Sequence, residues 1–160
     1  MPQAERYAWF SLAAWAAILF FLLTRFTAGL EVLGQSFGLT VVEQSAGRLL
    51  WTYVTLAVIA IVAESVIAGV LSARAGKTDI EKDERDLAIE VKANLASYWF
   101  TAAALNVIVI HVLANAAYGG HDLPKLNLTS LTGVAFALLL VLTLAEIVKR
   151  VAVIWNYRLA

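Results

Sequence analysis

The sequence predicts an all-α integral membrane protein, a four-helix bundle, and three observations lead to this fold class. Hydrophobic residues make up 61% of the 160 residues and the mean hydropathy is +0.78, whereas soluble domains contain about 45–50% apolar residues. Four apolar blocks are each long enough to cross about 30 Å of hydrocarbon as a helix. Between the second and third blocks, residues 74–92 carry eleven of the twenty-four charged residues. We therefore expect a single transmembrane domain over residues 1–160.

The predicted spans cover residues 7–26, 50–71, 95–117 and 126–148. Backbone polar groups in lipid need partners within the chain, so each span is expected to be a helix. The first block is longer than the 7–15 residue apolar core of a signal peptide, and we interpret it as a retained span.

Capping patterns predict where the helices begin. Thr78 with Glu81 forms a capping box, and no Gly or Pro interrupts residues 79–117, so the third span is expected to start as a charged cytoplasmic helical segment over 78–94. Thr40 with Glu43 predicts a second helix start before span two.

The remaining connections are also marked in the sequence. Gly29, Gly34 and Gly38 predict a turn-rich loop, with a close helix contact through Gly34 and Gly38 as the alternative. Ser130 is expected to cap span four, whose helix is predicted to extend into the cytoplasm as far as Tyr157.

The distribution of Lys and Arg predicts that both termini are cytoplasmic. Nine of the twelve basic residues lie on the side of the termini and the charged segment, against Arg25, Arg48 and Lys125 on the other side. Trp9 and Trp155 are then expected near the cytoplasmic interface, where aromatic side chains concentrate.

Several functional classes are excluded or disfavoured by composition. The net charge of zero argues against nucleic-acid binding. The absence of cysteine removes disulfides, thiol catalysis and thiolate metal sites. Because no nucleophile elbow, HExxH motif or glycine-rich phosphate loop is present, we predict no enzymatic activity, no cofactor and no metal site.

Polar residues within the spans are the first set of candidate functional residues. A carboxylate costs several kcal/mol inside a membrane unless it is protonated, paired or hydrated, so Glu64 is a candidate by default. Helical rise places Asn106 near enough to touch Glu64, and His111 too far outward for a direct pair. His111 and Asn115 share a helix face at i,i+4. Glu64 is interpreted either as a proton- or cation-coupling group or as a hydrogen-bonded helix contact.

Charged residues of the cytoplasmic segment are the second set of candidates. Asp79, Asp83, Asp86 and Glu90 have the spacing i, i+4, i+7 and i+11, which places four carboxylates on one helical stripe beside Arg85. Such a stripe suits a basic partner, a neighbouring subunit or divalent cations. The alternative is an ordinary solvated helix face.

The same segment carries a family resemblance. Asp83-Glu84-Arg85-Asp86, then Ile89, Lys92 and Ala93, then Ser97-Tyr98-Trp99, resemble a D-E-R-D-x-x-I-x-x-K-A junction of small, uncharacterised bacterial four-span membrane proteins. The resemblance covers about twenty residues. It implies a cytoplasmic-membrane location and no particular activity, with Arg85 and Lys92 cytoplasmic and either structural or partner-facing.

The sequence thus predicts a small, non-enzymatic, multi-pass protein of the bacterial inner membrane. It is expected to act as an interaction, regulatory or accessory-subunit protein, embedded in the lipid bilayer as a homo-oligomer or as part of a larger membrane complex, and to dock through its charged helix and span faces. The alternative is a small oligomeric transporter or channel in which Glu64 with Asn106 handles a proton or cation.

Overall fold

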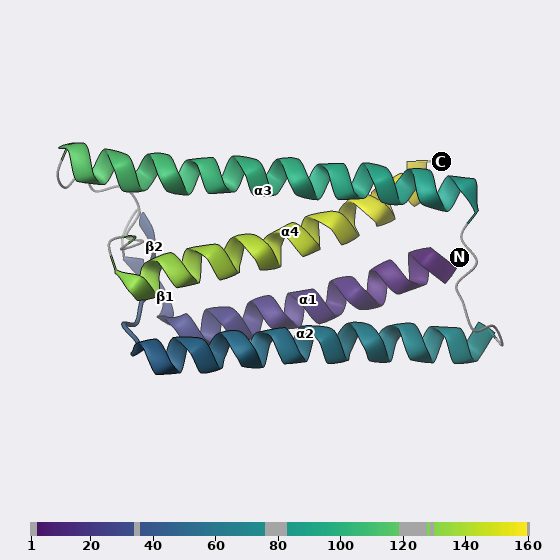
Figure 1. Cartoon of the computed structure of the whole chain (residues 1–160), viewed down its shortest axis with the longest axis horizontal. Coiled ribbons are helices and arrows are strands. Elements are labelled where there is room, and N and C mark those ends of the chain that lie inside the picture. The colour runs from purple at the N-terminus through teal and green to yellow at the C-terminus, as the bar shows by residue number, and fades with distance from the viewer. Residues whose placement is uncertain (1–2, 34–35, 76–82, 119–127, 129, 160) are drawn as a thin grey trace.

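The computed structural model of the chain describes residues 3–33, 36–75, 83–118, 128 and 130–159 (Figure 1). Four helices dominate it, and a short hairpin of two strands follows the first helix. In chain order the elements are α1 (Gln3–Phe26), β1 (Thr27–Leu33), β2 (Ser36–Val41), α2 (Ala46–Ala75), α3 (Glu84–Tyr118) and α4 (Leu131–Leu159). All four helices are long and apolar enough to cross a membrane, which confirms the predicted helical class.

The helices form a row in the order α3, α4, α1, α2 (Figure 1). Helix α4 packs on α1, α2 and α3, whereas α3 packs extensively only on α4. The fold is therefore more open than the bundle that the sequence predicts, with α2 and α3 at the two edges. The start of α1, the end of α4 and the start of α3 lie at one end, and the hairpin lies at the other (Figure 1); we call these the terminal end and the hairpin end.

Three helix starts are defined by side-chain caps. The Ser130 Oγ accepts the backbone N–H of Gly133 at 3.0 Å, which confirms the predicted cap of α4. It also places the start of α4 at Leu131, later than the predicted span boundary at residue 126. The predicted capping box of Thr40 and Glu43 is wrong, because Thr40 lies in β2. Ser45 caps α2 instead, and its Oγ accepts the backbone N–H of Arg48 at 3.4 Å.

Helix α3 begins at Glu84, and Asp83 caps it. The Asp83 carboxylate accepts a hydrogen bond from the backbone N–H of Asp86 at 2.7 Å. The backbone carbonyl of Asp83 accepts one from the N–H of Leu87 at 3.1 Å. The proposed start at Thr78 and Glu81 lies outside the described residues. From Glu84 onward the prediction of one uninterrupted helix is confirmed, because α3 runs unbroken through 35 residues.

The glycine-containing segment after α1 is an antiparallel hairpin of two strands, where the sequence predicted a turn-rich loop. Strand β1 pairs with β2 from Thr27 opposite Val41 to Leu33 opposite Ser36, with a bulge after Thr27. The N–H of Val42 donates to the carbonyl of Phe26 at 2.8 Å, which closes the hairpin at the end of α1. Because these residues form strands, the alternative of a helix contact through Gly34 and Gly38 does not apply to Gly38.

Two buried apolar clusters hold the helices together. Near the hairpin end, Phe26 and Phe136 are fully buried with ring centroids 5.3 Å apart. Near the terminal end, the side chains are smaller, which lets α3 and α1 approach α4 closely. The first cluster consists of Ile18, Leu22, Phe26, Leu49, Leu56 and Phe136, and the second of Ala8, Ile89, Ala93, Val153 and Ile154.

Candidate functional site

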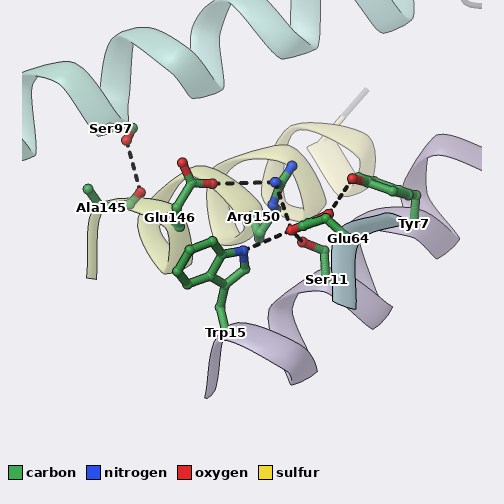
Figure 2. A network of polar contacts seen from close by, with 8 residues as sticks. All are labelled: Tyr7, Ser11, Trp15, Glu64, Ser97, Ala145, Glu146 and Arg150. Atoms are coloured by element: carbon green, nitrogen blue, oxygen red, sulfur yellow. Dashed lines mark hydrogen bonds and ion pairs between the residues drawn. The ribbon is translucent and has the colours of Figure 1, made fainter. Parts of the chain in front are cut away.

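The polar centre of the molecule is the carboxylate of Glu64 on α2 (Figure 2). Three side chains of α1 donate hydrogen bonds to it. The Tyr7 hydroxyl donates to Oε2, while the Ser11 hydroxyl and the Trp15 indole N–H donate to Oε1 at 2.5 and 2.8 Å. These donors have the spacing i, i+4 and i+8, so one face of α1 presents all three to α2.

Arg150 on α4 supplies the cation for this group. Its guanidinium lies 3.2 Å from Glu64 Oε1 and 3.3 Å from Oε2 of Glu146, one turn earlier on α4. The side chains of Arg150 and Glu64 are only 14% and 22% exposed, which limits solvent screening of the pair. The guanidinium also lies 5.5 Å from the centroid of the Tyr7 ring. Glu146 pairs locally, and Arg150 joins α4 to α2.

The hydrogen bonds and the ion pair of Glu64 connect helices to one another. A carboxylate offers about four lone-pair positions, and three neutral donors and one cation occupy the Glu64 carboxylate. Paired intramembrane charges of this kind face the interior of a bundle rather than lipid. The arrangement joins α1, α2 and α4 through one residue of α2. This helix otherwise packs little, because only 11% of the residues in its most apolar stretch are buried.

The predicted contact between Glu64 and Asn106 is wrong. Asn106 lies exposed on α3, and its side-chain amide donates to the carbonyl of Ala102 on the same helix at 2.8 Å. The reason is the order of the helices, which separates α3 from α2 by α4 and α1. His111 is also on α3, so the order of the helices separates it from Glu64 as well. His111 is half-buried without a hydrogen bond to the described residues, and Asn115 lies in α3 with its side chain outside the described part.

The predicted acidic stripe of residues 79–90 is mostly engaged within the molecule. Asp83 is the α3 cap, and Asp86 accepts a hydrogen bond from the Tyr157 hydroxyl on α4. Exposed Arg85 places its guanidinium 6.0 Å from the centroid of the same tyrosine ring. Glu90 lies in α3 on the wall of a cavity, and Asp79 lies outside the described residues. The stripe is therefore not a continuous free docking surface.

A cavity of about 380 Å³ opens beside the Glu64 group at the terminal end. Residues of all four helices line it, including Tyr7 of α1 and Ala68 of α2. Its charged lining residues are Asp86, Glu90, Lys149 and Arg150.

The sequence offered signals for several of these residues that its interpretation did not use. Tyr7, Ser11 and Trp15 repeat at helical spacing within an apolar span, which is the pattern of a polar helix face. Arg150 was counted only among the basic residues predicted to lie on the cytoplasmic side. Its side chain is long enough for its guanidinium to lie far from its own backbone, so the sequence did not fix its depth.

No group of three or more His, Cys, Asp or Glu residues suited to a metal ion occurs in the described parts of the chain. Comparisons with protein-family models, with curated proteins and with solved structures found no match for the chain.

Proposed function

We propose that this chain is a small, non-enzymatic interaction protein of the bacterial inner membrane that assembles with a second copy of itself through α3. Both ends of the chain would face the cytoplasm, in keeping with the nine-to-three distribution of basic residues. The resemblance of the Asp83 to Ala93 segment to bacterial four-span proteins supports the same location. Such a dimer would serve as a regulatory or accessory unit of a larger membrane complex.

The observation that carries this proposal is the exposed amide of Asn106. It lies at the midpoint of the predicted span 95–117, on the helix whose extensive packing within the described residues is on α4. One of its N–H groups donates within α3, which leaves a second donor and the carbonyl oxygen for another partner. Asn side chains in membranes hydrogen-bond across helix interfaces, because lipid tails offer them no hydrogen-bond partner.

The residues around Asn106 have the pattern of a helix interface. Exposed positions recur at intervals of four and three residues along α3, the spacing of a seam between paired helices. Ala103 provides the small side chain that lets two helices approach closely. In a two-fold symmetric pair the same seam is used by both copies, and a residue close to the symmetry axis meets its own equivalent. With Asn106 at the centre of the seam, the two Asn106 amides would bond to each other. The seam consists of Trp99, Ala103, Asn106, Ile110 and Leu113.

The transporter alternative has less support. It needs a carboxylate that exchanges protons or cations, and the four donors around Glu64 favour a permanent connection between helices. The expected partner Asn106 is also not beside it.

Cysteine cross-linking tests the proposal cleanly, because the natural chain has no cysteine. Ala103→Cys in membranes should give disulfide-linked dimers on mild oxidation. Val58→Cys, at an exposed position of α2, is the matched control and should stay monomeric. Equal cross-linking at both positions, or none at Ala103→Cys, would contradict an α3 interface.

A second experiment isolates the amide. Asn106→Leu should weaken dimerisation in detergent by roughly threefold to thirtyfold, which corresponds to about 0.6–2 kcal/mol for an interhelical hydrogen bond. Thr55→Leu is the control, because Thr55 is likewise an exposed polar residue bonded to a carbonyl of its own helix, that of Trp51. An Asn106→Leu variant that dimerises as well as the natural chain would contradict the proposal.

A further inference from the structure

The cavity at the terminal end separates its charges by helix. Helix α4 contributes two cations, Lys149 and Arg150, and α3 contributes two carboxylates, Asp86 and Glu90. Buried Ile89 and other apolar residues complete the lining. A volume of about 380 Å³ lies within the roughly 300–1,000 Å³ of small-molecule sites. The lining therefore suits a ligand that carries both charges and an apolar portion.

The cationic side of the cavity has unused hydrogen-bonding capacity. Half-buried Lys149 makes no ion pair or hydrogen bond with the described part of the chain, although Arg150 beside it pairs with two carboxylates. A half-buried ammonium group that lines a cavity still needs hydrogen-bond acceptors, so an anionic oxygen of a ligand fits beside Lys149.

The position of the cavity indicates where such a ligand comes from. Trp9 and Trp155, 41% and 64% exposed, lie on α1 and α4 at the same end of the molecule, and Trp concentrates at the level of lipid head groups. Helices α2 and α3 both line the cavity without packing extensively on each other. A lipid is the molecule that has both charged groups and apolar chains at this depth.

We propose that this cavity binds the head group of a glycerophospholipid of the ethanolamine type, which carries a phosphate diester and an ammonium group. The phosphate accepts hydrogen bonds from Lys149 and Arg150, and the ammonium donates to the carboxylates of Asp86 and Glu90. Asp86 retains free lone pairs for this contact although it accepts the Tyr157 hydroxyl. Basic pockets between membrane helices are known to hold phosphate head groups; the two carboxylates add selectivity for a zwitterion. This lipid site does not depend on the α3 dimer.

Lipid titration by native mass spectrometry of the full chain in detergent tests the site. Phosphatidylethanolamine should bind in one copy per chain, at least about tenfold more tightly than phosphatidylglycerol, which lacks the ammonium. Lys149→Gln should weaken binding of both lipids by about tenfold, since a hydrogen bond to a charged group is lost. Lys92→Gln, which removes a cation from an exposed position of α3, should leave both affinities unchanged.

The carboxylate side has its own test. Glu90→Gln should weaken binding of phosphatidylethanolamine and not of phosphatidylglycerol, with Glu84→Gln at an exposed position of the same helix as control. Equal affinity of the natural chain for the two lipids would overturn the role of the carboxylates. Unchanged affinities in Lys149→Gln would overturn the site itself.

A third measurement needs no variant and so does not depend on variant folding. Soluble phosphoethanolamine should compete with bound phosphatidylethanolamine at millimolar concentration, while inorganic phosphate at the same concentration should compete less. Failure of phosphoethanolamine to compete would overturn recognition of the head group. Competition by inorganic phosphate at equal strength would overturn the two-charge recognition. Dimer formation through α3 is read in separate experiments, so either proposal can fail alone.

Discussion

The two halves of the molecule are held together by different kinds of contact. In the half near the hairpin, large apolar side chains such as Phe26 and Phe136 fill the space between helices. In the half near the termini, Glu64 and Arg150 connect three helices through hydrogen bonds and an ion pair. Lipid is as apolar as leucine, so burial alone gives little preference for one helix over another within a membrane. The polar half therefore supplies specificity, and the apolar half supplies close packing.

The largest effect should come from the ion pair. Arg150→Met leaves the half-buried Glu64 carboxylate without this cation and should lower the free energy of unfolding by about 3 kcal/mol, the lower end of the range known for breaking a buried pair. Denaturant titration of the chain in mild detergent measures this loss.

Two further variants sharpen the test of the ion pair. The double variant Arg150→Met with Glu64→Gln should be more stable than Arg150→Met alone, because no uncompensated charge remains. Lys149→Met, which removes the neighbouring unpaired cation, should change stability by less than about 0.5 kcal/mol. Strictly additive costs of the two substitutions would show that Glu64 and Arg150 are not coupled.

The second effect tests the apolar half. Phe136→Ala should cost about 2 kcal/mol, less than the 3–5 kcal/mol typical of a soluble core, because the cavity term persists while transfer to lipid costs little. Leu138→Ala is the control, since this side chain is 41% exposed. The same denaturant titration applies. A Phe136→Ala loss no larger than that of Leu138→Ala would mean that packing in this half contributes no more than lipid contact.

The smallest effect concerns the edge helix. The Ser97 hydroxyl donates to the carbonyl of Ala145 at 2.9 Å and joins α3 to α4 (Figure 2). Ser97→Ala should cost about 0.6 kcal/mol, the mean for a hydrogen bond between membrane helices. Thr101→Val removes a hydroxyl that bonds within α3, to the carbonyl of Ser97, and should be closer to neutral in the same titration. Reversal of this order would place the α3 to α4 connection elsewhere.

Hydropathy was sufficient to predict the four helices, and capping chemistry was sufficient for the start of α4 but not for that of α2. The four apolar blocks all appear as helices, and Ser130 caps α4 as predicted. The hairpin was missed because glycine was interpreted as a sign of irregular structure. Phe37, Leu39 and Val41 alternate with Ser36, Gly38 and Thr40, and this period of two is the strand signal that was present.

The candidate site was predictable only in part. Glu64 was identified from its residue type and depth, because an intramembrane carboxylate needs a partner. Its partners depend on which helices are neighbours, and four spans of similar hydropathy carry little information on that order. Asn106 was therefore assigned to the wrong contact, while Tyr7 and Arg150, 57 and 86 residues from Glu64 along the chain, were not recognised as its partners.

The Glu64 group also has a consequence for the order of synthesis. Arg150 lies 86 residues after Glu64, which at about 5–20 residues per second means that α2 exists for roughly 4–17 s before its cation is made. The Tyr7, Ser11 and Trp15 donors are already present on α1 during that interval. Helix α1 can thus hold the carboxylate before α4 exists, and the arrival of α4 completes the ion pair. A chain truncated before Arg150 would keep the Glu64 carboxylate and its three donors on α1, and would lack the cation that joins α4 to α2.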